Sequence, residues 1–216
     1  IISLIFGGVV ILYTNTYLNN MVKQSLVEIA KMGANNIENK IEWHLERLEL
    51  LSESEIIYSD DYSIKDKLNY LHQSDKPNDH TEYAYITKDG MMYSVSGMKF
   101  DVSQEQFFLE AMEGQQSVEM MEQRFYQDYP AIAFTYPVFY NNSIKSFISL
   151  IYSAEALCEI VENITFDQAG YGYIIDSKGV TLAHIDRNLV KNKVISIDDA
   201  MGDPGQKKLA DLEKRM

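Results

Sequence analysis

Apolar residues recur every three or four positions from Val22 to Leu51, and polar or charged residues fill the positions between them. This spacing places the apolar side chains on one face of an α-helix. No proline interrupts the stretch from Met21 to Ser52. The pattern therefore predicts a long amphipathic stalk helix over residues 15–54. Its apolar face can cover the chain's own domain, a second copy of the helix, or both, and we expect a weak parallel homodimer through it.

An uncharged apolar run, Ile1 to Tyr13, precedes the stalk. As a helix it would span about 20 Å, whereas the hydrocarbon core of a bilayer is about 30 Å thick. It is either the core of a signal peptide, which a small-residue cleavage site should follow, or the outer part of a transmembrane helix whose start is missing. Residues 15–20 contain no convincing cleavage site, and Tyr13 and Tyr17 suit a membrane interface. The sequence favours a partial transmembrane helix over residues 1–14 that anchors the chain to the membrane.

After Ser52 the pattern changes to short strands separated by turns. Strands are predicted at 83–87, 91–95, 116–126, 131–140 and 145–153. Helices are predicted at 63–73, at 103–112 with Ser103 as its cap and Gly114 as its end, and at 154–163. A second strand–turn–strand follows at 172–184. The two hairpins share an aromatic strand, a polar turn and a glycine, which indicates two similar antiparallel-sheet modules, the second incomplete. The fold class is α+β.

Charge and cysteine content narrow the function. The chain has 32 acidic and 19 basic side chains, a formal charge of −13. This balance disfavours nucleic acid as a partner, because phosphates require Lys and Arg to replace their counterions. Cys158 is the only cysteine, so no internal disulfide can form. It lies in an apolar run, which predicts a buried small hydrophobic residue.

No catalytic, metal or cofactor motif is visible in the sequence. The histidines (His44, His72, His80 and His184) lack metal-ligand spacing with one another and with Cys158, and are interpreted as surface or structural. The sequence has no phosphate-binding glycine loop and no nucleophile elbow. These observations favour a binding module over an enzyme. The alternatives are a membrane-anchored extracytoplasmic enzyme and a structural domain without a small-molecule ligand.

The segment from Phe100 to Asp128 is the richest in candidate chemistry, because aromatic residues alternate there with carboxylates. One interpretation is a core helix packed on a sheet. The other is an aromatic-walled pocket, in which ring faces attract a cation and a carboxylate supplies the countercharge. With Tyr85 from the neighbouring strand, the candidate ligand-binding residues are Tyr85, Phe100, Glu105, Phe107, Phe108, Tyr126 and Asp128.

The order of these motifs resembles the double Cache sensor domain of bacterial transmembrane receptors. The similar segments are 101–114, 131–138, 171–184 and 209–213. The resemblance implies a long N-terminal helix followed by tandem PAS-like antiparallel-sheet modules, a membrane-distal one over 55–163 and a truncated membrane-proximal one over 164–216. It also implies extracytoplasmic small-molecule sensing at the cell membrane. The output domain would be of the chemoreceptor, diguanylate cyclase or histidine kinase type and lies outside this chain.

The same resemblance bears on the ligand. Amino-acid-binding members of the family have an Arg two residues before the aromatic pair, and Glu105 stands at that position here. The family's Tyr-x-Asp, which meets the ligand ammonium, is similar to Tyr126-Gln127-Asp128. A further family Asp falls near Ile151 and is missing. The resemblance therefore implies an amine or another cationic small molecule rather than a free amino acid.

Overall fold

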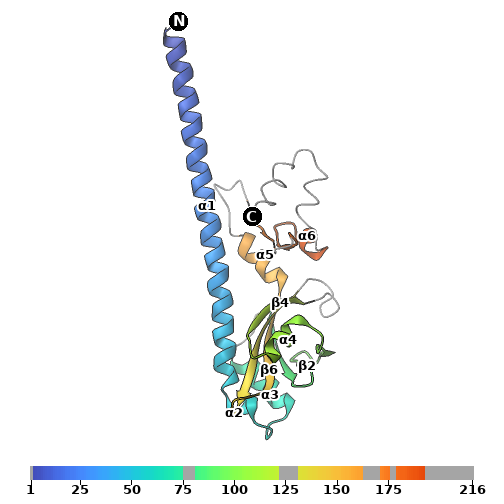
Figure 1. The fold of residues 1–216 in the computed structure, drawn as a ribbon. Helices are drawn as coiled ribbons and strands as arrows, with labels where there is room; N and C mark the ends of the chain where they lie inside the picture. Colours follow the sequence, from blue (N-terminus) through green and yellow to red (C-terminus); the bar gives the residue numbers. More distant parts are fainter. Residues whose placement is uncertain (1, 75–80, 122–130, 163–170, 176–178, 193–216) are drawn as a thin grey trace.

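One helix dominates the computed structural model, which describes residues 2–74, 81–121, 131–162, 171–175 and 179–192, with side chains from residue 14 onward. Helix α1 (Ile2–Ser52) is 51 residues long, and its N-terminal half extends far beyond the globular body (Figure 1). The helix expected over residues 15–54 is confirmed up to Ser52, and it continues to Ile2 at its other end. Within the described residues, no helix is apolar over a sufficient length to cross a membrane.

The globular body is built on a six-stranded sheet with the order β3-β2-β1-β6-β5-β4. Every pairing in it is antiparallel. The strands are β1 (Thr81–Thr87), β2 (Met91–Ser94), β3 (Lys99–Asp101), β4 (Ser117–Met121), β5 (Ala131–Tyr140) and β6 (Ser143–Ser153). The predicted antiparallel sheet is confirmed. Strand β3 is an addition to the predicted strands.

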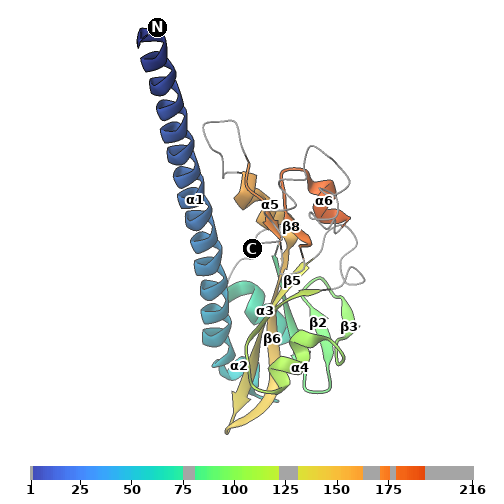
Figure 2. The same cartoon turned by 45° about the horizontal axis from the view of Figure 1, so that its top comes forward.

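The β5–β6 hairpin is closed by Asn141 and Asn142, whose φ angles are 50° and 59°. Two consecutive left-handed residues form the turn whose twist matches the flanking strands, and asparagine tolerates this conformation better than most residues do. The turn falls between the strands predicted at 131–140 and 145–153. The hairpin fixes the register of the two longest strands, which lie next to each other in the sheet (Figure 2).

The sheet has an apolar cluster on each face, because successive side chains of a strand point to opposite sides. On one face, here called the stalk face, the C-terminal end of α1 buries Leu45, Leu48 and Leu51. The stalk face also holds the sheet residues Tyr83, Tyr85, Phe134, Val138, Ile148, Leu150 and Tyr152. The other face, here called the α4 face, is covered by the short helix α4 (Gln106–Met112). It holds Ala84, Ile86, Ala131, Ala133, Phe147 and Ile151 from the sheet.

The start of helix α4 differs from the prediction, whereas its end at Gly114 agrees with it. The helix begins at Gln106, with Glu105 at the N-cap position and no capping side chain, so Ser103 is not its cap. Ser103 instead donates its backbone N–H to the Asp101 carboxylate at 2.9 Å, which holds it in the preceding turn. At the other end, Gly114 (φ 85°) donates to the Ala111 carbonyl at 3.0 Å, and the left-handed glycine terminates the helix as expected.

The remaining elements surround the sheet. Helices α2 (Glu55–Tyr58) and α3 (Ile64–Ser74) follow α1, and α5 (Ala154–Glu162) continues directly from β6. The helices predicted at 63–73 and 154–163 are confirmed. The second predicted hairpin is the two-stranded sheet β7 (Ile174–Ile175) and β8 (Thr181–Ala183). Helix α6 (Arg187–Lys191) follows it and was not predicted. Cys158 is fully buried in α5, as expected.

Candidate ligand-binding site

The candidate residues divide between the two faces of the sheet. Phe107 and Phe108 are buried in the cluster of the α4 face, and Phe100 packs against it. Tyr85 is buried on the stalk face, because it is displaced by one position in β1 from Ala84 and Ile86. Two candidates, Tyr126 and Asp128, lie outside the described residues. The structure therefore brings three of the aromatic residues together and separates the fourth from them by the sheet.

Phe107 and Phe108 are fixed by the contacts of a packed core. The ring of Phe108 meets that of Phe147 edge-on, with centroids 5.2 Å apart. The Phe107 carbonyl accepts a hydrogen bond from the Ser117 hydroxyl at 3.1 Å, which ties α4 to the start of β4. Both side chains thus contribute to folding of the α4 face, whatever else they contact.

Glu105 starts helix α4 through its backbone. Its carbonyl accepts the N–H groups of Phe108 and Leu109, both at 3.1 Å. The residue is half-buried, two positions before the buried Phe107. A carboxylate at the beginning of a helix is favoured by the helix dipole.

Tyr85 has a cationic neighbour within the chain. The ammonium of Lys67, from α3, donates to the Tyr85 hydroxyl at 3.2 Å and lies 4.8 Å from the centre of its ring. Lys67 is only 3% exposed. The contact between an aromatic ring and a cation, expected at Tyr85 for a ligand, is made here by the chain's own lysine.

A cavity of about 600 Å³ lies on the stalk face, at the end of the sheet that is next to α5. Seven elements contribute to its wall, from the stalk helix to the β7–β8 hairpin. Its apolar lining consists of Ile37, Ile41, Val118, Met120, Ile132, Phe134, Leu157, Ile160, Ile174 and Leu182. The volume is in the range of pockets that bind small molecules. None of the candidate residues that the structure describes (Tyr85, Phe100, Glu105, Phe107 and Phe108) is among its lining residues.

Helix α1 contributes two polar side chains to the cavity, Lys40 and His44. The Lys40 ammonium lies 5.1 Å from the centre of the Tyr152 ring. His44 is 7% exposed, and its ring lies 5.1 Å from Phe134 and 5.4 Å from Tyr152. The structure places His44, which the sequence interpretation gave as a surface or structural residue, in a buried position beside two aromatic rings. Aromatic rings therefore form one wall of the cavity, with a lysine beside them.

Sequence reasoning missed this cavity, although part of its signal was visible. Ile37 and Ile41 belong to the apolar stripe of α1, and Lys40, three positions after Ile37, is a charged residue on the same side of the helix. A lysine within a stripe that packs on a sheet is a usable signal. The strand residues that line the cavity gave no such signal, because each of them taken alone is typical of a hydrophobic core.

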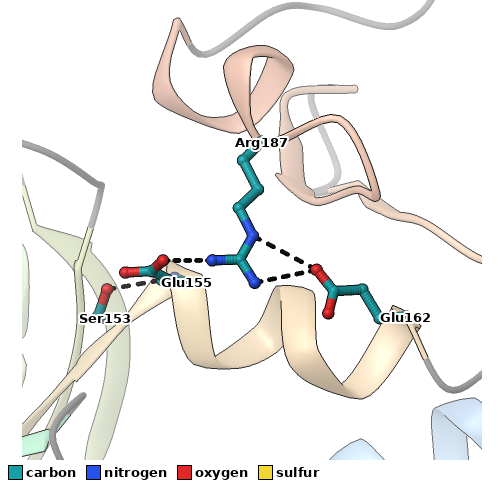
Figure 3. Close-up of polar contacts among 4 residues, drawn as sticks. All are labelled: Ser153, Glu155, Glu162 and Arg187. Atoms are coloured by element: carbon teal, nitrogen blue, oxygen red, sulfur yellow. Dashed lines mark hydrogen bonds and ion pairs between the residues drawn. The ribbon is translucent and has the colours of Figure 1, made fainter.

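Helix α5, on one side of the cavity, is also joined to the last described helix. Arg187, in α6, forms ion pairs with Glu155 and Glu162 at the two ends of α5, and its pair with Glu162 measures 2.9 Å (Figure 3). The backbone N–H of Glu155 donates to the Ser153 hydroxyl at 3.2 Å. Burial raises the pKa of the Cys158 thiol in the same helix. Arg187 thus spans α5 and connects the β7–β8 region to the end of β6.

No group of three or more histidine, cysteine or acidic residues arranged to hold a metal ion occurs in the part of the chain that the structure describes.

Comparison with known proteins identifies the fold. No protein-family model and no curated sequence matches the chain. The sensory domain of the Campylobacter jejuni chemoreceptor Tlp3 is similar over 88% of this chain and 83% of that one, with a TM-score of 0.66 and 13% identity. A Tlp3 structure with isoleucine bound has a TM-score of 0.66 and 14% identity, over 85% of this chain and 78% of that one. The ligand-binding domain of the Pseudomonas aeruginosa chemoreceptor PctC in complex with GABA has a TM-score of 0.62 and 20% identity, over 79% of this chain and 78% of that one.

At these identities the likeness concerns the fold. This chain has the fold of the sensory and ligand-binding domains of bacterial chemoreceptors, with a long helix leading into an antiparallel sheet. The resemblance to the double Cache sensor domain is confirmed at that level.

Proposed function

We propose that this chain is the extracytoplasmic part of a membrane receptor that senses a small molecule and is not itself an enzyme. The observation that carries the proposal is the fold, which is shared over 79–88% of the chain with domains whose described role is sensing or ligand binding. In the proposed receptor, residues 1–14 belong to a membrane anchor, residues 55–163 form the membrane-distal module, and residues 164–216 form part of the proximal one.

The course of α1 supports a signalling role. One continuous helix leads from the proposed membrane side to the far end of the sheet (Figure 1). Its C-terminal end is buried against the stalk face, whereas Val22 and Leu26 of the same stripe are 41% and 45% exposed. We propose that this outer part of the stripe pairs with the stalk of a second copy. Binding in the sheet module would then reach the output domain through the stalk.

The ligand proposed for the distal module is a small amine or another cation. Asp128 is its countercharge, Tyr126 and Phe107 form walls, and Glu105 repels anionic ligands. A cation loses hydration on entering a cavity, so binding requires a paired carboxylate. The ligands named for the similar chemoreceptor domains, isoleucine, L-valine and GABA, all carry an amino group. The formal charge of −13 is also favourable to a cation.

The variant Asp128→Asn tests this proposal. Removing one partner of a partly buried charge pair costs about 2–5 kcal/mol, so amine affinity should fall roughly 30-fold or more. Calorimetric titration with a panel of amines, amino acids and carboxylates measures the change. The matched control is Asp61→Asn, because Asp61 is exposed and remote from α4 in the chain. Amine binding that survives Asp128→Asn, or no binding by any member of the panel, contradicts the proposal.

A further inference from the structure

We infer that the cavity on the stalk face is a second binding site, separate from the proposed amine site, and that it takes a small apolar carboxylate. The ligand's tail occupies the apolar part of the cavity, and its carboxylate pairs with Lys40. The opposite charge preference distinguishes this site from the one proposed around Asp128.

The apolar part of the inference rests on the walls. Phe134, Ile132 and Leu157 come from β5 and α5 and line the cavity together with Val118 of β4. A volume of about 600 Å³ accommodates a ligand the size of a phenylalkanoate. Apolar surface transferred from water into such a cavity contributes about 25 cal/mol per Å². The tail therefore supplies most of the binding free energy.

The charge preference rests on Lys40. Ile37, Lys40 and His44 follow one another at steps of three and four, so they lie on the same face of α1, and all three line the cavity. The Lys40 ammonium is held over the Tyr152 ring at 5.1 Å. A partly dehydrated ammonium beside apolar walls favours an anion within reach.

Glu119, the acidic residue among the described lining residues, does not cancel this preference. Glu119 in β4 pairs with Ala133 in β5, and residues directly opposite in an antiparallel pair point to the same face of the sheet. Ala133 is buried in the cluster of the α4 face, so the Glu119 carboxylate points away from the cavity. Its neighbours Val118 and Met120 point inward. Among the described lining residues, the charge that a ligand meets inside is the positive charge of Lys40.

The position of the cavity gives its occupant a role. The wall combines α1, the β4–β5 edge of the sheet, α5 and the β7–β8 hairpin. A ligand that contacts all of them stabilises one arrangement of the stalk relative to both sheets. The site therefore couples a second chemical signal to the same stalk, and it does so by favouring the conformation in which the cavity is formed.

Three probes with one carbon skeleton test the inference on the whole chain: phenylbutyrate, phenylbutanol and phenylbutylamine. By calorimetry, phenylbutyrate should bind about tenfold more tightly than phenylbutanol, because it adds one charge-assisted contact to Lys40. Lys40→Gln should remove this advantage and leave phenylbutanol unchanged. The control Lys31→Gln removes an exposed lysine of the same helix that does not line the cavity and should change neither affinity.

Two further variants separate the sites. Val118→Phe, on an edge strand that tolerates aromatic residues, fills part of the cavity and should weaken both phenylbutyrate and phenylbutanol. Asp128→Asn should leave phenylbutyrate binding intact, whether or not it abolishes amine binding. Equal affinity for phenylbutyrate and phenylbutylamine, or a phenylbutyrate affinity untouched by Lys40→Gln, overturns the inference. If Val118→Phe does not fold, the Lys40→Gln result decides alone.

Discussion

Two glycines with nearly the same backbone conformation differ in what surrounds them. Gly90 has a φ of 87° and Gly97 a φ of 90°, so both occupy a region that residues with a side chain rarely adopt. A Cβ added at Gly90 would lie 2.6 Å from the Cβ and 2.7 Å from the Cα of Ser103, whereas one added at Gly97 would meet nothing within 4 Å. The turn after β1 is therefore pressed against the segment that leads into α4.

We predict that Gly90→Ala destabilises the chain by about 3 kcal/mol, from about 1 kcal/mol of backbone strain and a steric clash with Ser103. Gly97→Ala should cost about 1 kcal/mol, because it carries the strain alone. Urea unfolding of the two variants measures the difference as a shift in midpoint at constant slope. Equal losses would show that the contact with Ser103 relaxes without cost.

At the same scale, Lys67 shows what the sequence did not reveal. Lysine side chains are almost never fully buried unless they are paired, yet the Lys67 ammonium is buried on Tyr85. Ser103 shows the reverse, because its residue type favours a helix cap but the Asp101 carboxylate holds its backbone in a turn. Local preference failed at both positions, since a contact with a distant or neighbouring side chain determined the outcome.

At the scale of elements, the periodicity of apolar residues predicted the long helix and the long strands. Helix α1 and strands β1, β5 and β6 are long enough for apolar spacing to identify them. Strand β3 has three residues and pairs only with β2, so it offers no period to read. The cavity escaped prediction for another reason: its wall exists only after seven elements have packed, and no local spacing encodes that arrangement.

The link between α5 and α6 leads to a prediction at this scale. Arg187 is 35% exposed, and ion pairs of this kind contribute about 1 kcal/mol or less. Arg187→Gln should therefore leave the unfolding temperature nearly unchanged but accelerate amide exchange in residues 181–191, because it frees α6 from α5. Hydrogen-exchange mass spectrometry measures this local effect.

The control for that experiment breaks another ion pair. Lys145→Gln removes the exposed contact to Asp60, which measures 2.6 Å and lowers the pKa of the Asp60 carboxyl. Exchange in residues 181–191 should be unaffected by this change. Faster exchange in both variants would indicate a general effect of lost charge rather than a connection through Arg187.

At the scale of the whole molecule, α1 has two environments. Leu48 is fully buried against the sheet, whereas the N-terminal part of the stripe lies on the portion of the helix that extends past the globular body (Figure 1). The sequence left open whether the stripe covers the chain's own domain or a second copy. In the structure, the C-terminal end of the stripe covers the chain's own domain. In the proposed dimer, the rest of the stripe contacts a second copy.

A crosslinking experiment tests that dimer in the proposed membrane-bound receptor. Cysteine at Leu26 or Ile29, both on the stripe, should form an intermolecular disulfide under mild oxidation. Cysteine at Glu28, on the opposite side of the helix, should not. The native Cys158 is fully buried and gives no background. Crosslinking at Glu28 as strong as at Leu26, or none at any stripe position, contradicts a specific stalk dimer.

The order of the strands also affects how the chain is made. Strand β1 lies between β2, which follows it at once, and β6, whose pairing residues come 59 to 71 positions later. These residues leave the ribosome several seconds after β1, at a synthesis rate of ~5–20 residues per second. During that interval one edge of β1 has no partner, and the leucines at the end of α1 lack the β5 and β6 surface that buries them. The nascent chain thus exposes an unpaired strand edge and an apolar helix face at the same time. Its most vulnerable moment comes before Ser153 has been synthesised, and holding that intermediate apart from its neighbours is a task for the cell's chaperones.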